Sequence, residues 1–373
     1  MTPTTVDQTA KNMQRRQFLA QSTLATAALL APASLLSSAP DNRPLGIALV
    51  GLGNYATHQL APALQQTKNC RLAGIVTGSP EKAATWKAKY SIPDKNIYNY
   101  ETFDRIRDNP DIDIVYVVLP NSMHAEYTIR AARAGKHVIC EKPMALNVRE
   151  CEQMIAACAE AKVQLGIGYR LYYEPHHLEM RRLGVEKPLG AVKTIESSLG
   201  FSMANPESWR LNKAMGGGGA IMDLGVYCIQ GARRTVGELP FAVTAQGYVR
   251  DTKVFKGIYE MMMFQMEFPG GAVSNSTTTY SSYVDRLYAT SDYRWFGLQP
   301  SYNATGAKGI SSEAPIDYKT PDFQQIAQMD AFVQNVRDNT IPEASGLEGM
   351  TDLKIIEAIV LAAQKGQRVE LKW

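Results

Sequence analysis

Three side chains in two separate stretches of the sequence could together oxidise an alcohol. Lys142 stands between an apolar run and Pro143, and Asp223 and Tyr227 follow the four glycines at 216–219. Positions i and i+4 of a helix share one face, so the carboxylate and the phenol are expected to project side by side. Oxidising a hydroxyl group needs a base that takes its proton as hydride leaves. A tyrosine serves where a nearby cation lowers its pKa from about 10, and Lys142 would supply that cation while Asp223 fixes a substrate hydroxyl.

Each of these residues also has an ordinary structural interpretation. Lys142 could be a solvated loop residue, and Tyr227 could belong to the core side of an amphipathic helix. The glycine-rich approach and the neighbouring Asp223 favour the chemical interpretation.

A glycine-rich turn near residue 50 is typical of a dinucleotide site. An apolar strand predicted at 45–50 leads directly into GLGNYA and an alanine-rich helix that continues to about residue 66. Gly51 allows the tight turn, Gly53 lets the backbone approach a pyrophosphate, and Ala56 lets the helix pack closely. The helix N-terminus then stabilises the phosphate charge. We also assign Asn54 and Tyr55 to this cofactor site.

The residues after the second predicted strand, 71–76, favour NADP over NAD. An NAD enzyme usually has Asp or Glu at the end of this strand to bind the ribose hydroxyls, whereas this chain continues TGSPEK. Thr77 and Ser79 can donate hydrogen bonds to a 2′-phosphate, and Lys82 can bring a positive charge to it. Glu81 is interpreted as a solvated charge in the first turn of the next helix.

Alternating strands and helices continue to about residue 168 and predict a doubly wound parallel sheet. Helices are expected at 79–89 and 102–107, and strands at 112–119 and 137–140. Ligands bind at the carboxyl ends of the strands in such sheets. The residues that follow these strands are therefore assigned to the cofactor site, and they are Leu119, Pro120, Asn121, His124, Glu141, Lys142 and Pro143.

After Tyr169 the periodicity changes to β-rich runs that are separated by Gly, Pro and Asp turns. These runs cover 192–199, 243–248, 261–268 and 272–280. They predict a largely antiparallel sheet, and amphipathic helices are expected at about 322–337 and 347–364. The predicted fold class is α/β, with an NADP-binding Rossmann domain at 40–168. A substrate-binding and oligomerisation domain with an open, mostly antiparallel sheet would occupy 169–373.

Composition limits the partners. With 373 residues the chain is long enough for two domains, and its net charge of +3 includes no basic run that would follow nucleic-acid phosphates. The five cysteines form neither a CxxC motif nor a metal-ligand spacing, so they are predicted to be buried free thiols without a metal. The aromatic stretch at 280–296 could stack on rings, but sheet and interface packing is the preferred interpretation.

The first 39 residues have the order of an export signal. Arg15 and Arg16 precede an apolar run, and small residues end it at candidate cleavage sites near Ala33 and Ala39. Adjacent arginines followed by Phe-Leu resemble the twin-arginine type, whose machinery exports folded proteins. We therefore expect a periplasmic protein that receives its cofactor before export. An uncleaved membrane anchor is the alternative.

Four stretches carry a resemblance to a known family: GLGNYA, LPNSMHAEYTIRAARAGKHVICEKPMA, GYRLYYEP and GGGGAIMDLGVY. Over 45–372 the chain resembles the glucose–fructose oxidoreductase, inositol dehydrogenase and rhizopine-catabolism family, and most closely its glucose–fructose oxidoreductase branch. The resemblance implies that Lys142, Asp223 and Tyr227 are catalytic, and that the peptide bond before Pro143 is cis. It also implies a sugar pocket lined by Tyr169 and Arg170. Arg170, Trp209 and Arg210 are assigned to the cofactor site as well.

The same resemblance implies an activity. NADP would stay bound while an aldose is oxidised at C1 to a lactone and a ketose or second aldose is reduced to a polyol, in a homodimer or homotetramer. Only residues 40–44 separate the expected cleavage site from the first strand, which argues against an arm that buries the cofactor.

Three other functions stay open. They are an NADP-dependent aldose or dihydrodiol dehydrogenase that releases its cofactor, an exported NAD-dependent glycosidase, and a non-catalytic sugar-binding protein. The Thr77–Lys82 phosphate corner and Tyr227 argue against the glycosidase, and the complete catalytic set argues against the last.

Overall fold

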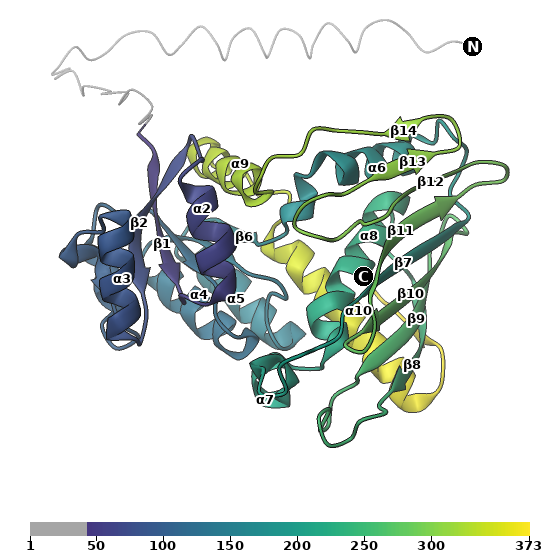
Figure 1. Cartoon of the computed structure of the whole chain (residues 1–373), viewed down its shortest axis with the longest axis horizontal. Coiled ribbons are helices and arrows are strands. Elements are labelled where there is room, and N and C mark those ends of the chain that lie inside the picture. The colour runs from purple at the N-terminus through teal and green to yellow at the C-terminus, as the bar shows by residue number, and fades with distance from the viewer. Residues whose placement is uncertain (1–42) are drawn as a thin grey trace, which may run out of the picture. The chain divides into compact units, whose positions relative to one another are not determined.

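The structure, a computed structural model, describes residues 43–373 and contains two sheets with helices packed on them (Figure 1). The expected signal at 1–39 lies outside the described residues. Within 43–373, no helix is both long enough and apolar enough to cross a membrane.

The first sheet is parallel, six-stranded and doubly wound, as predicted. Its strands are β1 (Leu45–Val50), β2 (Cys70–Val76), β3 (Ile97–Tyr98), β4 (Ile114–Val117), β5 (His137–Cys140) and β6 (Leu165–Ile167). They lie in the order β3-β2-β1-β4-β5-β6. The order reverses between β1 and β4, and in such sheets this switch point opens a ligand crevice at the carboxyl ends of the strands.

Helices cover both faces of this sheet and give it two separate cores. The elements are α2 (Ala61–Leu64), α3 (Pro80–Tyr90), α4 (His124–Arg133), α5 (Val148–Glu160), and short 3-10 helices at Asp94–Asn96, Phe103–Asp108 and Asn121–Met123. Val50, Val115 and Val138 point toward the face of α4 and α5, whereas Ile47 and Leu49 point toward that of α2.

The helix expected after Gly53 differs from the prediction. It is helical from residue 54, but residues Ala56–Leu60 form a π-turn, in which the Ala61 N–H bonds to the Ala56 carbonyl five residues back. Only one α-helical turn follows, in α2, where Pro62 has no N–H to continue the regular pattern. The helix expected at 102–107 is a 3-10 helix.

The second sheet is open, nine-stranded and mostly antiparallel, but β7 and β10 pair in parallel. Its strands are β7 (Thr194–Gly200), β8 (Ala242–Tyr248), β9 (Met261–Glu267), β10 (Val273–Thr279), β11 (Val284–Thr290), β12 (Trp295–Leu298), β13 (Gly309–Ser311), β14 (Pro315–Ile316) and β15 (Val369–Glu370). Their order is β14-β13-β12-β11-β7-β10-β9-β8-β15.

One face of this sheet packs against helices. These are α6 (Pro175–Glu186), α8 (Val226–Val236) and α10 (Gly346–Lys365) (Figure 1). Three short elements lie nearer the first sheet: α7 (Lys213–Gly216) and the 3-10 turns at Arg170–Tyr172 and Trp209–Leu211. Along β9, Met262, Phe264 and Met266 are buried, whereas Met263 and Gln265 are exposed. The strict alternation shows that the opposite face of the sheet is uncovered in the single chain.

Helix α9 (Gln325–Asp338) comes from the C-terminal part of the sequence but packs on the first sheet (Figure 1). Met329, Phe332 and Val333 share the core that contains β1. Gly166 makes room for it, because a Cβ there would lie 2.7 Å from the Phe332 ring. The first core is therefore completed by residues far beyond 168.

Candidate active site

A cleft of about 720 Å³ opens at the carboxyl edge of the first sheet and is closed on its other side by the second half of the chain. Both expected residue groups, those of the dinucleotide site and those of the catalytic set, line this one cleft. From the predicted residues it brings together Gly51, Gly53, Asn54, Tyr55, Ala56, Thr77, Lys82, Leu119, Pro120, Asn121, Glu141, Lys142, Arg170, Trp209, Arg210, Asp223 and Tyr227.

The glycine turn has the backbone that the sequence motif requires. Gly51 has φ +97°, and a Cβ there would lie 2.7 Å from the Val118 carbonyl oxygen. Only glycine fits such a close approach without strain. At Gly53 a Cβ would meet nothing within 4 Å, so the turn exposes open backbone to the cleft. This arrangement suits a pyrophosphate held against the start of the following helical segment.

The corner expected to hold a 2′-phosphate is built from Thr77, Ser79 and Lys82. Lys82 Nζ donates to the Leu52 carbonyl at 3.1 Å, which holds the ammonium beside the glycine turn. Ser79 Oγ caps α3 by accepting from the Lys82 N–H at 3.3 Å. Thr77 and Lys82 line the cleft, while Ser79 is placed behind them at the helix start. Tyr100 also lines this corner, which the sequence interpretation missed.

The three residues predicted to be catalytic come from three elements. Lys142 follows β5, Asp223 lies in a second π-turn, Ile221–Gly225, and Tyr227 lies in the first turn of α8. Lys142 Nζ donates to Asp223 Oδ1 at 3.1 Å and to the Asp223 carbonyl at 2.8 Å. The same ammonium lies 4.6 Å from the Tyr227 ring centroid. The lysine thus contacts the carboxylate and lies over the ring of the phenol.

Asp223 is a fixed anion. Its Oδ2 accepts from Arg210 Nε at 3.1 Å and from the Tyr280 hydroxyl at 3.0 Å. Burial alone would raise the pKa of Asp223, but Lys142 and Arg210 outweigh burial and lower this pKa to about 2. In turn, burial would lower the pKa of Lys142, but Asp223 outweighs it and the pKa is raised. The pair is therefore ionised at neutral pH, and Asp223 serves as an anchor rather than as a base.

A second cation faces Tyr227. The Arg170 guanidinium lies 5.4 Å from the Tyr227 ring centroid and is almost fully buried. It donates to the carbonyls of Tyr302 at 2.5 Å and Asn303 at 3.3 Å, and to the side chain of Gln324. These acceptors prevent the guanidinium from leaving the phenol. Positive charge on both Lys142 and Arg170 stabilises negative charge that develops on Tyr227.

Glu141 forms the back wall of the cleft beside Lys142. Its Oε1 accepts from the Tyr116 hydroxyl at 2.7 Å, and Tyr116 in turn accepts from Gln328 Nε2 of α9 at 2.9 Å. Burial raises the pKa of Glu141, while Tyr116 and Lys142 oppose that rise. Tyr55 is held in the same way, because it accepts from Gln325 Nε2 at 2.8 Å. Helix α9 therefore supports the cofactor side of the cleft from behind.

Four predicted residues do not line the cleft: Ser79, His124, Pro143 and Tyr169. The His124 ring nitrogens lie 2.9 Å from the Leu119 and Pro143 carbonyls, and burial lowers the pKa of His124, so the neutral imidazole donates to one of these two carbonyls. Pro143 follows a cis peptide bond, as the resemblance implied. Tyr169 is buried and stacks on Tyr172 with ring centroids 5.4 Å apart. Tyr169 therefore does not line the expected sugar pocket, whereas the next residue, Arg170, does.

Several residues that sequence reasoning missed complete the cleft. Phe201, Met203, Tyr302 and Asn303 line its outer wall, and Tyr280 binds Asp223 from just below the surface. Tyr280 was grouped with an aromatic stretch interpreted as packing. No spacing in the sequence relates it to Asp223, because the two residues are 57 positions apart and meet where the π-turn that holds Asp223 packs against β10.

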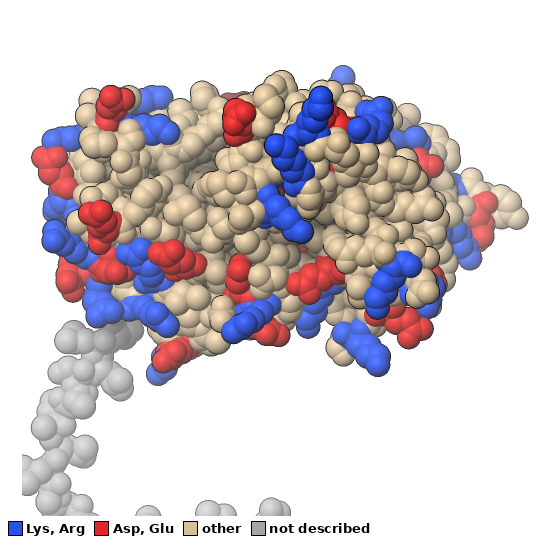
Figure 2. Space-filling model, turned by 90° about the horizontal axis from the view of Figure 1, so that it is seen from below, with Lys and Arg blue, Asp and Glu red and all other residues tan. Residues whose placement is uncertain are grey.

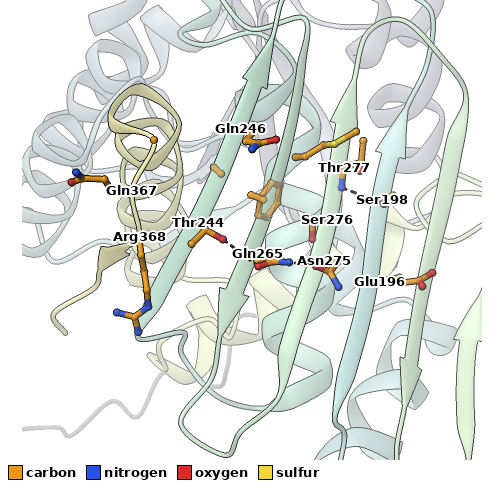
Figure 3. Close-up of a pocket in the computed structure, with 14 residues that line it drawn as sticks. Glu196, Ser198, Thr244, Gln246, Gln265, Asn275, Ser276, Thr277, Gln367 and Arg368 are labelled. Atoms are coloured by element: carbon orange, nitrogen blue, oxygen red, sulfur yellow. Dashed lines mark hydrogen bonds between the residues drawn. The ribbon is translucent and has the colours of Figure 1, made fainter.

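The outer face of the second sheet carries another hollow, of about 660 Å³ (Figure 3). Gln265 lies in a row between Thr244 and Asn275, bonded to them at 3.3 and 2.7 Å. Nearby on β11 and β12, the rings of Tyr288 and Trp295 stack with centroids 5.5 Å apart, whereas Tyr283 and Tyr293 of the same aromatic stretch are exposed. The row itself consists of amide and hydroxyl groups. Two charged residues also line the hollow, and each forms ion pairs: Glu196 with Arg286, and Arg368 with Glu267 and Glu370.

Neither the face drawn in Figure 2 nor the metal-binding side chains of residues 43–373 indicate a second site. On the face drawn in Figure 2, Lys and Arg side chains are interspersed with Asp and Glu. Among residues 43–373 no cluster of His, Cys, Asp and Glu could hold a metal ion. All five cysteines are free and buried, as predicted.

Comparisons with known proteins agree with this geometry. Residues 45–169 match the model of the oxidoreductase family with an NAD-binding Rossmann fold, and residues 177–311 match the GFO/IDH/MocA C-terminal domain. The structure is similar to that of aldose-aldose oxidoreductase from Caulobacter crescentus complexed with glycerol, with a TM-score of 0.86 and 42% identity, covering 88% of this chain and 100% of that one.

Two curated relatives are more distant. D-xylose 1-dehydrogenase [NADP(+)] of Haloarcula marismortui is 27% identical over 343 residues, covering 90% of this chain and 95% of that protein. Trans-1,2-dihydrobenzene-1,2-diol dehydrogenase of Xenopus tropicalis is 30% identical over 213 residues, covering 56% and 61%. The chain belongs to the GFO/IDH/MocA family of oxidoreductases with an NAD-binding Rossmann fold.

Proposed function

We propose that this protein is an NADP-dependent sugar oxidoreductase that oxidises an aldose at C1 to a lactone and reduces a second aldose or a ketose to a polyol. One observation carries the proposal: the Lys142 ammonium and the Arg170 guanidinium lie 4.6 and 5.4 Å from the Tyr227 ring centroid, in the same cleft as the glycine turn. A phenol flanked by two cations suits proton exchange with a sugar hydroxyl.

The residues of the chain account for the proton and for the orientation of the sugar. Tyr227, as phenolate, takes the proton of the C1 hydroxyl, and Lys142 stabilises the oxygen from which that proton leaves. Asp223 holds Lys142 in place through its Oδ1 and its carbonyl. NADP bound in the cleft would supply the hydride acceptor for the oxidation and, once reduced, the hydride donor for the reduction. Tyr227 then gives its proton to the new alkoxide, so that the two half-reactions balance.

The nucleotide side fits NADP. The open backbone at Gly53 can receive the pyrophosphate, and Lys82 stands beside the turn with Thr77. The second strand, β2, ends without an acidic residue, so nothing there repels a 2′-phosphate. The Haloarcula marismortui relative is named for NADP, which supports the same choice.

Coupling of two sugars on one site is supported by the solved structure that is 42% identical over nearly the whole described chain, since that protein is named an aldose-aldose oxidoreductase. An exported enzyme would also gain from keeping its cofactor, because free NADP is not expected outside the cytoplasm. The runner-up is a dehydrogenase that releases NADPH, as the xylose dehydrogenase relative suggests.

Isotope transfer distinguishes the two. The protein is mixed with substoichiometric NADP, an aldose deuterated at C1, and an unlabelled acceptor sugar. Coupling on one site places deuterium in the polyol as fast as lactone forms. A conventional dehydrogenase stops after one equivalent of NADP is reduced, and no oxidation of any aldose would contradict the proposal.

We further propose export by the twin-arginine machinery to the periplasm, and assembly into a homodimer or homotetramer. Arg15 and Arg16 support the first. The uncovered face of the second sheet, where Met263 is 43% exposed, supports the second. The model of the GFO/IDH/MocA C-terminal domain matches residues 177–311, which include strands β7 to β13 of this sheet.

A further inference from the structure

Tyr280 reaches the catalytic cluster from the second sheet. It directly follows β10, and its hydroxyl donates a hydrogen bond to Asp223 Oδ2 at 3.0 Å. Its side chain is only 2% exposed. The ring stacks on Phe255 at 6.5 Å and tilts against Phe201 at 5.5 Å. The hydroxyl therefore has little freedom to turn away from the carboxylate.

The acceptor atoms of Asp223 are divided between two sides. Oδ2 takes the two donors from the second half of the chain, Tyr280 and Arg210, while Oδ1 and the backbone carbonyl take Lys142. Because Oδ2 is held, Oδ1 stays turned toward the lysine. The position of Lys142 over Tyr227 thus depends on what holds Oδ2.

The two residues that donate to Asp223 Oδ2 differ in how easily a ligand could displace them. The Arg210 side chain is 38% exposed, stacks on Trp209 and lines the cleft, so a sugar can compete for its guanidinium. Tyr280 is buried, does not line the cleft and has Asp223 as its hydroxyl partner. Burial, with the added effect of Asp223, raises the pKa of Tyr280 well above its ordinary value, so the hydroxyl keeps its proton.

We propose that Tyr280 is a positioning residue that fixes Asp223 and, through Asp223, holds Lys142 against the catalytic Tyr227. The inference rests on the proposed function, because the placement of Lys142 matters to turnover only if Tyr227 exchanges the proton.

The kinetic test uses Tyr280→Phe, which removes only the hydroxyl. The variant loses a hydrogen bond to the charged Asp223 carboxylate, so kcat is expected to fall about tenfold, while KM for the sugar and Kd for NADP stay unchanged. Tyr98→Phe is the matched control, because it also removes a buried hydroxyl with one hydrogen bond, to Asn109 at 2.7 Å, outside the cleft. Loss of NADP binding in Tyr280→Phe, or an equal loss of kcat in the control, would overturn the positioning role.

A double-mutant cycle tests whether Tyr280 acts through Asp223. If Tyr280 acts only through Asp223, Tyr280→Phe has no further effect on the single-turnover rate in an Asp223→Ala background. The same fold loss in both backgrounds would mean that Tyr280 acts on its own, against the proposal.

A crystal structure of Tyr280→Phe gives a readout that does not depend on the reaction. The Asp223 carboxylate is expected to rotate and its 3.1 Å contact with Lys142 to lengthen. An unmoved carboxylate would overturn the positioning role even if no sugar is ever found to react. A rotated carboxylate in a protein that oxidises no aldose would leave this inference intact and remove the proposed function instead.

Discussion

At the scale of single residues, the site depends on cationic side chains that outnumber their hydrogen-bonded carboxylate partners. Two cations, Lys142 and Arg170, face one phenol, and only Lys142 has a carboxylate partner in Asp223. Arg170 is satisfied by carbonyl and amide oxygens, which carry no full charge. The guanidinium therefore faces the phenol without a hydrogen-bonded carboxylate, and we expect activity to depend most on Tyr227.

Tyr227→Phe keeps the ring between the two cations and removes the proton acceptor. General acid–base catalysis contributes about 10²- to 10⁴-fold, so aldose oxidation should fall by at least about a hundredfold. NADP binding, measured by fluorescence titration, should stay unchanged. The control is Tyr248→Phe on β8, whose hydroxyl bonds only to Gln246 at 2.6 Å. Unchanged turnover in Tyr227→Phe would remove Tyr227 from the role of base.

Lys82→Ala tests the 2′-phosphate corner. Losing a charge-assisted contact should weaken NADP binding about tenfold or more and leave NAD binding nearly unchanged. Lys89→Ala is the matched control on the same helix, because Lys89 lies over Tyr90 at 5.1 Å and outside the cleft. Equal weakening of NADP binding and NAD binding would show that Lys82 does not bind the 2′-phosphate.

At the scale of elements, the buried strands were the most predictable part of the fold. β1 and β5 have the predicted bounds, because strands buried on both faces form continuous apolar runs. The two π-turns, Ala56–Leu60 and Ile221–Gly225, could not be predicted. Over a single turn, an apolar pattern does not distinguish a π-helix from an α-helix. Both π-turns line the cleft, and the second presents the Asp223 carbonyl to Lys142.

The sequence also could not predict which helices pack closely against each other, as α6 and α8 do. Gly184 on α6 faces α8 so closely that a Cβ would lie 1.8 Å from the Thr235 carbonyl oxygen. Gly184→Ala should therefore force the helices apart and lower the free energy of unfolding by about 1 to 3 kcal/mol, measured by urea denaturation. Arg181→Ala, which changes a half-exposed side chain on the same helix, should change it by less than about 0.5 kcal/mol. Equal stability of both variants would contradict the packing argument.

At the scale of the whole molecule, the cleft exists because distant parts of the chain return to the first sheet. The sequence pattern predicted a helix near α9 but could not show that it covers the first sheet, since an amphipathic helix does not specify which apolar surface it meets. Gln325 and Gln328 of α9 then support Tyr55 and Tyr116. Likewise, Tyr280 and Arg210 meet at Asp223 from segments that no local motif connects.

The export proposal also belongs to this scale. Replacing Arg15 and Arg16 with lysine in the full chain should keep the protein in the cytoplasmic fraction with its first residues uncleaved. The unchanged chain should appear in the periplasmic fraction, shortened near Ala33 or Ala39. Mass spectrometry of both fractions checks this, and identical fractionation of the two chains would exclude the twin-arginine route.

The central claim is that one cleft holds NADP and passes hydride between two sugars. The most direct test purifies the exported protein without added nucleotide, identifies what denaturation releases, and titrates the native protein while the absorbance of reduced nicotinamide is followed. We expect stoichiometric NADP that an aldose reduces and that a ketose or second aldose reoxidises. Bound NAD, or bound NADP that no aldose reduces, would contradict the account.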